Sequence, residues 1–267
     1  AGRTLPPGAI ALIASQGLPR VSVVRRPRVA IIPTGDELAA PGESTGPGAI
    51  VDSNGPMLAA LVRQAGALPD RRPAVGDDLE ALTHAFASAL AEADLLLTTG
   101  GVSVGDHDHV KAALEGAGVS LSVRKVAVKP GKPLAFGRHG SGTPVLGLPG
   151  NPVSALATFT LFAGPAIRRL LGDPQPSPAR VRARLAAPIR HRPGRTELSR
   201  AWLHREDGEW VATPHRNQGS GAVVALGQSN ALVLVPADST GLAVGTMVET
   251  LPLEALRGEP FDRPLDT

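Results

Sequence analysis

Apolar residues between positions 28 and 171 follow two alternating patterns. Short continuous apolar runs are typical of strands buried on both faces, whereas apolar positions that recur every three to four residues are typical of amphipathic helices. The runs predict strands at Arg28–Pro33, Leu68–Val75, Asp94–Thr99 and Ser120–Val128, and a hairpin formed by Leu134–Gly137 and Val145–Leu148.

The helical pattern predicts four helices, at Asn54–Gly66, Asp77–Glu92, Asp106–Gly116 and Pro152–Leu171. Ser53 or Asn54 is expected to cap the first of them and Asp77 the second, because short polar side chains accept hydrogen bonds from free N–H groups at helix starts. Strands that alternate with helices indicate an α/β domain built on a mostly parallel sheet.

The alternation stops at Gly172–Pro178, a Pro-rich stretch that we take as the domain boundary. The five segments that follow are short and β-branched or alternating, with turn residues between them, and they predict a small all-β domain over residues 178–252. The α/β domain then covers residues 28–172. Residues 1–27 are expected to be an irregular remnant of a preceding domain, and residues 253–267 a loose tail.

The composition of the chain excludes several kinds of bond, metal site and catalytic residue. A length of 267 residues suits about two domains. The absence of Cys excludes disulfides, Cys-ligated zinc, iron–sulfur clusters and Cys nucleophiles. No apolar run reaches the ~18 residues of a membrane span. The first residue is Ala1 and no signal-peptide pattern follows it, so we expect a piece of a longer chain and, by default, a cytoplasmic location.

Lysine is rare in this mildly basic chain, which has a net charge of +3. There are four Lys against 23 Arg, yet Lys125, Lys129 and Lys132 lie within eight positions. Pro130 and Pro133 restrict the backbone between and after them, so Lys129 and Lys132 form compact charges on a stiff turn that suits an oxyanion. The alternative is a solvated basic turn.

Three polar, Gly-rich turns follow buried strands: Thr34–Glu37, Gly100–Asp106 and Pro149–Ser154. Because the carboxyl ends of the strands in an open α/β sheet face one crevice, these turns should meet there. Glycines allow close backbone approach, and helix starts present free N–H groups to an anion. A single turn of this kind is more often a plain connection, but three together favour a phosphate or oxyanion site.

Carboxylates recur near the same edge and suit a Mg²⁺–nucleotide site, since Mg²⁺ prefers oxygen ligands. They are Asp36, Glu37, Asp77, Asp78, Asp106 and Asp108. For Asp77 and Asp106, helix capping is the alternative explanation. Zinc at Asp106–His109 is disfavoured because no third His or Cys stands at a fitting distance.

Eight Arg fall between Arg180 and Arg205. Nucleic-acid surfaces usually interleave aromatic residues, and only Trp202 is present here, so most of these Arg are expected on exposed strand faces. Arg195 and Arg200 follow a turn and are the candidates for anion contacts from the second domain, together with Ser220.

Five ordered motifs now resemble the molybdopterin molybdenumtransferases (MoeA), whose animal relative is the gephyrin E domain. They are Thr34–Leu38 (TGDEL), Gly100–Asp108 (GGVSVGDHD), Lys129–Pro133 (KPGKP), Leu148–Ser154 (LPGNPVS) and Asn217–Ser220 (NQGS). The resemblance covers residues 1 to about 252. It implies a three-layer molybdopterin-binding α/β domain followed by a small β-barrel.

The resemblance also implies an activity, in which molybdate is inserted into adenylylated molybdopterin and AMP is released with the help of Mg²⁺. The cofactor's own sulfurs would ligate the molybdenum, which agrees with a chain without Cys.

By motif position, the catalytic residues would be Asp108, Glu37, Lys129 and Lys132, and Mg²⁺ would be held by Asp77, Asp78, Asp106 and Asp108. Cofactor, phosphate and molybdate contacts would come from Thr34, Gly35, Gly100, Gly101, Ser103, Gly105, Pro133, Gly150, Asn151, Ser154, Arg195 and Ser220. The choice between Arg195 and Arg200 stays open.

Members of this family begin with two further domains and work as homodimers, in which the partner subunit completes the cleft; a molybdopterin adenylyltransferase is a further expected partner. The alternatives are a molybdopterin adenylyltransferase, which shares the Gly-Gly-Val-Ser and Asp-x-Asp motifs, and a non-catalytic scaffold of the gephyrin kind. A nucleic-acid binder ranks third, and neither nucleic acid nor a membrane is an expected partner.

Overall fold

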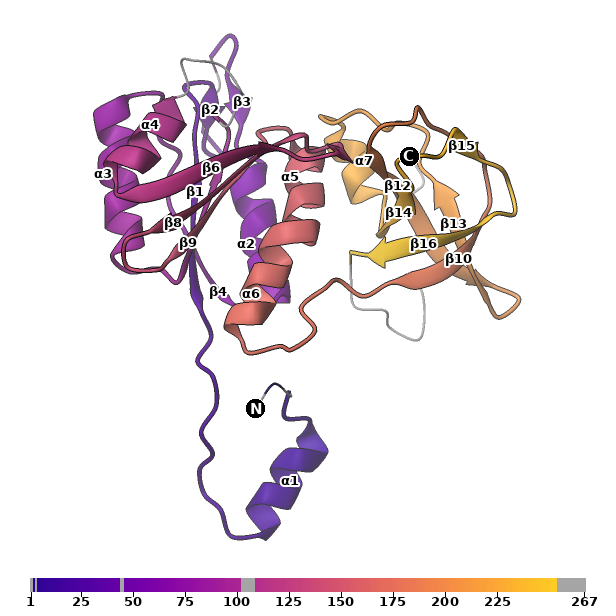
Figure 1. Cartoon of the computed structure of the whole chain (residues 1–267), viewed down its shortest axis with the longest axis horizontal. Coiled ribbons are helices and arrows are strands. Elements are labelled where there is room, and N and C mark those ends of the chain that lie inside the picture. The colour runs from indigo at the N-terminus through magenta and orange to yellow at the C-terminus, as the bar shows by residue number, and fades with distance from the viewer. Residues whose placement is uncertain (1, 3, 44–45, 102–108, 254–267) are drawn as a thin grey trace.

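The computed structural model describes residues 2, 4–43, 46–101 and 109–253. Two folded domains follow one another along the chain, with the boundary in the segment between residues 171 and 180 (Figure 1). Among the described residues, no helix combines the length and the apolar character that crossing a bilayer requires.

The first domain is built on a six-stranded sheet with the order β4-β1-β5-β9-β8-β6. Its strands are β1 (Arg28–Pro33), β4 (Leu68–Arg71), β5 (Leu95–Thr99), β6 (Val119–Lys125), β8 (Pro133–His139) and β9 (Pro144–Leu148). β4, β1, β5 and β9 pair in parallel, whereas β8 pairs antiparallel with both β9 and β6. The mostly parallel sheet and the hairpin expected from the sequence are therefore confirmed.

Helices cover both faces of this sheet (Figure 1). One face packs against α3 (Leu79–Leu90) and α4 (His109–Gly116) through a cluster that includes the fully buried Phe86. The other packs against α2 (Asn54–Gln64) and against a helical run made of α5 (Pro152–Thr158), the π-helical turn η1 (Phe159–Ala163) and α6 (Gly164–Leu170). β1 and β5 are buried on both sides, which explains their continuous apolar sequence.

The second domain is a small barrel, as expected. Its five strands are β10 (Val181–Leu185), β12 (Thr196–Glu206), β13 (Glu209–Pro214), β14 (Ala231–Val235) and β16 (Met247–Pro252). They close into a ring because β13 pairs with β12 as well as with β10. Shorter elements are β11 (Ile189–Arg190), β15 (Gly241–Leu242) and α7 (Val223–Gly227), a helix that the sequence analysis did not predict.

One short strand of the first domain belongs to the sheet of the second. β7 (Val128–Lys129) follows β6 and pairs in parallel with the start of β12, where Glu197 stands opposite Lys129. An apolar cluster from both domains, including Leu156 of α5 and Leu232 of β14, packs beneath this connection. The turn Lys129–Pro133, which we call the lysine turn, therefore lies where the two domains meet.

The first 27 residues differ from the expectation of an irregular segment. They contain α1 (Pro7–Ser15), a helix with no buried residue, which an extended stretch connects to β1 (Figure 1). The sequence analysis missed this helix because Pro and Gly frame its apolar pairs and no polar face marks its period. A last parallel pair, β2 (Leu38–Ala39) with β3 (Ile50–Val51), lies between β1 and α2.

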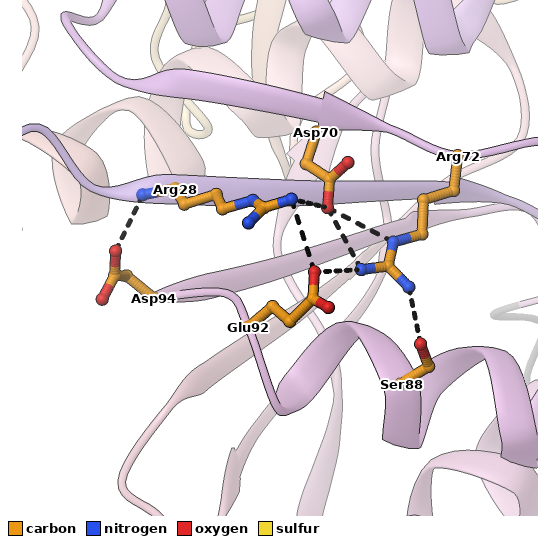
Figure 2. A network of polar contacts seen from close by, with 6 residues as sticks. All are labelled: Arg28, Asp70, Arg72, Ser88, Glu92 and Asp94. Carbon is orange, nitrogen blue, oxygen red and sulfur yellow. Dashed lines mark hydrogen bonds and ion pairs between the residues drawn. The ribbon is translucent and has the colours of Figure 1, made fainter.

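Charged residues at the amino end of the sheet tie β1, β4, α3 and the start of β5 together (Figure 2). Arg72 pairs with Asp70 and Glu92 and donates to Ser88, while the Arg28 backbone N–H donates to Asp94 at 2.8 Å. A hydrogen bond from Arg25 holds the pKa of the Asp94 carboxyl below its usual range. This network orients the extended stretch that enters the domain.

The packing of α3 leads to a stability prediction. Phe86→Ala should lower the free energy of unfolding by about 3–5 kcal/mol, because it empties a fully enclosed ring position between the helix and the sheet. Leu79→Ala on the same helix removes a side chain that is 46% exposed and should cost less than about 1 kcal/mol. Urea titration of both variants measures the difference, and equal losses would contradict this assignment of the core.

Candidate functional site

The described parts of the three Gly-rich turns meet at the carboxyl end of the parallel strands, as the sequence predicted, and for the second turn these parts are Gly100 and Gly101. The Thr34 N–H donates to the carbonyl of Thr99 at 2.9 Å, and the Gly100 N–H donates to the carbonyl of Leu148 at 3.3 Å. Gly100 has a φ of +99°, and a Cβ there would lie 2.2 Å from the carbonyl oxygen of Thr34. Glycine is therefore required at this position for both its conformation and its space.

Asn54, at the start of α2, ties these turns together. Its amide nitrogen donates to Thr99 Oγ1 at 2.9 Å and to the carbonyl of Gly150 at 2.7 Å. Its carbonyl oxygen is buried and has no partner among the described residues. The sequence analysis considered Asn54 only as a helix cap, because one polar residue before a helix gives no signal of contacts with distant turns.

The turns enclose a cleft of about 560 Å³, which we call the strand-end cleft. It is lined by Pro33, Thr34, Glu37, Leu38, Ile50, Val51, Asp52, Ser53, Asn54, Thr99, Gly100, Gly150, Asn151, Pro152, Gly221 and Val223. Gly221 and Val223 come from the second domain. The predicted residues Thr34, Glu37, Gly100, Gly150 and Asn151 are thus brought together, and Gly35 and Gly101 lie beside them in the same turns.

The predicted Ser220, next to the cleft-lining Gly221, contacts the turn that carries Asn151. The Asn151 side-chain amide donates to Ser220 Oγ at 3.2 Å, and the Val153 N–H donates to the Ser220 carbonyl at 3.1 Å. Ser154 is buried at the start of α5. These contacts join the Asn151–Ser154 turn to the Asn217–Ser220 turn.

The predicted acidic residues have different roles in the structure. Glu37 lines the cleft, and Asp36 accepts a hydrogen bond from the Asp77 N–H at 2.8 Å. Asp78, not Asp77, caps α3, because its carboxylate accepts from the Ala81 N–H at 2.8 Å. The expectation of an Asp77 cap was therefore wrong by one residue.

The described acidic residues do not form a metal site by themselves. Neither Asp77 nor Asp78 lines the cleft, and within residues 2–253 as described no group of three or more His, Asp or Glu side chains converges. Ser103, Gly105, Asp106 and Asp108, which were also predicted for this site, lie outside the described residues.

A second cavity, of about 450 Å³, carries a concentration of positive charge, and we call it the basic pocket. It is lined by Lys129, Arg190, His191, Arg192, Pro193 and Arg195. Lys129 comes from β7, Arg190 from β11, and the others from the β11–β12 connection. Four permanent cations around one cavity attract an anion, and Arg190, His191 and Arg192 are contributors that the sequence analysis did not single out.

The lysine turn packs on α5, the helix that also borders the strand-end cleft. Gly131 has a φ of +117°, and a Cβ there would lie 2.7 Å from Thr158 Cγ2 and 3.7 Å from the carbonyl oxygen of Ser154. Lys132 is exposed after this glycine, and Pro133 begins β8. The turn therefore carries Lys129 and Lys132 on a backbone that is held against the helix.

Burial distinguishes Arg195 from Arg200. Arg200 is 0% exposed, and its guanidinium donates to the carbonyls of Asn217 at 2.7 Å and Gly219 at 3.1 Å. Burial lowers the pKa of Arg200 from its ordinary value, an effect that the nearby Glu197 opposes. Arg195 is exposed and lines the basic pocket, so of the two candidates it is the one that lies beside a cavity.

Comparison with known proteins agrees with this architecture. The family model described as "Probable molybdopterin binding domain" matches residues 30–169, and the model described as "MoeA C-terminal region (domain IV)" matches residues 182–253. The molybdopterin molybdenumtransferase of Nostoc sp. is 41% identical over 252 residues, which cover 91% of this chain and 57% of that protein. Molybdopterin molybdenumtransferase 2 of Mycobacterium tuberculosis is 36% identical, with coverage of 93% and 62%.

Solved structures show the same relationship. The molybdopterin biosynthesis MoeA protein from Pyrococcus horikoshii superposes with a TM-score of 0.82 at 30% sequence identity, covering 96% of this chain and 61% of that protein. The chain thus spans about three fifths of the length of the relatives that it matches. With both domain models matched in order, the chain belongs to the MoeA family of molybdenum cofactor biosynthesis proteins.

Proposed function

We propose that this chain carries the ligand-binding core of a molybdopterin molybdenumtransferase, which inserts molybdate into adenylylated molybdopterin and releases AMP. The observation that carries the proposal is the presence of two cavities in the chain. One is a glycine-lined cleft bordered by Pro152 of α5, and the other is a cationic pocket lined by Lys129, from the turn that packs on α5. A cleft of about 560 Å³ has room for a nucleotide or pterin group, and the pocket offers charge for a small oxyanion.

In this proposal the strand-end cleft holds the adenylylated cofactor. Thr34, Gly35, Gly100, Gly101, Gly150 and Asn151 present backbone and small polar groups at the ends of parallel strands, where anionic ligands bind in α/β folds. Ser103, Gly105, Asp106 and Asp108 are assigned to the same ligand by their motif alone. Ser154 and Ser220 belong to the turn contacts that join the cleft to the second domain.

The basic pocket and the lysine turn are assigned to molybdate. Lys129 and Lys132 are compact point charges, and Arg195 adds a planar donor, so that together they attract and orient a tetrahedral dianion. Two Mo–S bonds then form on the cofactor's dithiol as one oxide leaves with the two thiol protons as water. Water also cleaves the phosphoanhydride bond that joins the cofactor to AMP.

We assign Glu37 to the cleavage of that bond, since it is the described carboxylate that lines the cleft without serving as a helix cap or turn acceptor in any described contact. Asp77, Asp78, Asp106 and Asp108 remain the proposed Mg²⁺ residues by motif. The described residues do not converge into a metal site, and the proposed reaction steps use only the residues named above.

The proposal extends to further features that the resemblance to the family implies. It includes a homodimer whose partner subunit completes the cleft, a molybdopterin adenylyltransferase as a functional partner, and a cytoplasmic location. The adenylyltransferase reaction is the second candidate function for the chain itself, but the barrel domain and the Asn217–Ser220 turn speak against it, because their contacts with the cleft would have no role in that reaction.

The first prediction from the proposed function concerns Glu37. Glu37→Gln should reduce AMP release from adenylylated molybdopterin in the presence of molybdate by about 100-fold, the usual scale for losing an acid–base or charge-stabilising group. Glu80→Gln, an exposed carboxylate in the first turn of α3, is the matched control and should leave the rate unchanged. Quantifying AMP by chromatography measures both.

Two outcomes would contradict the proposed reaction. One is unchanged AMP release in Glu37→Gln. The other is accumulation of adenylylated molybdopterin from molybdopterin and ATP without molybdate, which would assign the chain to the adenylyltransferase class instead.

The second prediction separates Arg195 from Arg200. Arg195→Gln should weaken molybdate binding about tenfold and leave thermal stability unchanged, because its side chain is exposed at the pocket. Arg200→Gln should instead lower the free energy of unfolding by about 3 kcal/mol, since it removes a buried cation that holds two carbonyls. Calorimetric titration with molybdate and thermal melts test the pair, and a reversal of the two effects would overturn the assignment.

A further inference from the structure

One buried carboxylate lies beneath the basic pocket and contacts two of its residues. Glu197, at the start of β12, is 4% exposed. Its Oε2 accepts a hydrogen bond from Lys129 Nζ at 2.9 Å and lies 2.9 Å from His191 Nδ1. The buried Arg200 is also close enough for the charge of Glu197 to act on it.

The pairing of two strands places Glu197 beside Lys129. β7 pairs in parallel with β12, and Glu197 stands opposite Lys129 in that register. His191 contacts the same carboxylate oxygen, Oε2, and its ring is buried. Since the ring nitrogen Nδ1 can donate to the carboxylate, His191 holds Glu197 in the position from which it meets Lys129.

We propose that Glu197 is a positioning residue for Lys129, and that His191 supports Glu197. The inference rests on the proposed role of Lys129 in binding molybdate. A lysine side chain that is 47% exposed has a long flexible stem, and fixing its ammonium group costs rotamer entropy. Because Glu197 restrains the Lys129 side chain in the folded chain, part of this rotamer entropy is lost on folding, before the oxyanion binds.

The geometry leaves Lys129 able to bind. An ammonium group has three N–H donors, and Glu197 takes one of them, so two remain for an oxyanion in the pocket. The turn that follows is held against α5 at Gly131, which keeps the backbone end of the side chain in place as well. Lys129 is thus restrained at both ends of its stem.

The negative charge of Glu197 has the opposite effect, because it weakens the attraction of the pocket for an anion. Lys129, His191 and Arg200 surround this charge, whereas Lys129, Arg190, Arg192 and Arg195 line the cavity itself. We therefore expect positioning to outweigh repulsion. The two effects predict opposite signs when Glu197 is replaced, so one measurement separates them.

The experiment is a calorimetric titration of the chain with sodium molybdate. Glu197→Ala should weaken binding about tenfold, and Glu197→Gln, whose amide oxygen can still accept from Lys129, should stay within about threefold of the unmodified chain. Lys129→Met should also weaken binding, and adding Glu197→Ala to it should cause no further loss. Glu249→Ala, an exposed carboxylate paired with Arg180 on the same domain, is the control and should bind normally.

Three results would overturn the inference. Tighter binding by both Glu197 variants would show that repulsion dominates. A lower melting temperature with unchanged molybdate affinity would make Glu197 a purely structural residue. A further loss in the double variant as large as in the single one would show that Glu197 acts independently of Lys129.

A ligand-free readout keeps this inference separate from the proposed function. The chain has only four lysines, so the side-chain ammonium signals in a ¹H–¹⁵N spectrum can be assigned with Lys129→Met. The Lys129 signal should be sharper than those of Lys125 and Lys132, because its protons exchange more slowly with water, and Glu197→Ala should broaden it. A sharp signal without molybdate binding would refute the oxyanion role alone, whereas a broad signal in the unmodified chain would refute the positioning.

Discussion

The in-register parallel pairing of β1, β5 and β9 is the constraint on which the candidate site depends. Pro33 stands opposite Thr99, and Thr99 opposite Leu148, so three strands end at the same level of the sheet. Each strand then turns through glycine or a small polar residue. Because all three turns leave from one edge, a cleft forms there without any residue having to reach far from its strand.

Asn54 converts this meeting of turns into a rigid site. Its two donated hydrogen bonds connect the β5 and β9 ends, and Thr99 in turn donates to the carbonyl of Pro149 at 3.1 Å. The buried Asn54 side-chain nitrogen and the Thr99 hydroxyl are thereby paired within the turns, which keeps the backbone in place where a ligand would approach. The pairing of β7 with β12 likewise keeps the backbone of the lysine turn in place.

Sequence reasoning succeeded where a property is local and failed where it depends on distant contacts. The apolar runs and the turn residues predicted β1, β5 and β9 and the meeting of their ends. Asp78 rather than Asp77 caps α3, a difference of one residue that helix periodicity does not resolve. Arg200 was one of two candidates for an anion contact, but it is buried and its guanidinium donates to carbonyls of the Asn217–Ser220 turn.

The sequence by itself therefore determined the two-domain order, the α/β layer, the barrel and the motifs that place the chain in its family, since strand and helix periods and turn chemistry are written in consecutive residues. Only the tertiary structure decided which polar side chains serve the cleft and which hold the fold together. Glu197, His191 and Lys129 become one group, and Arg195 differs from Arg200, because burial and partners arise from the pairing of β7 with β12 and the closure of the barrel.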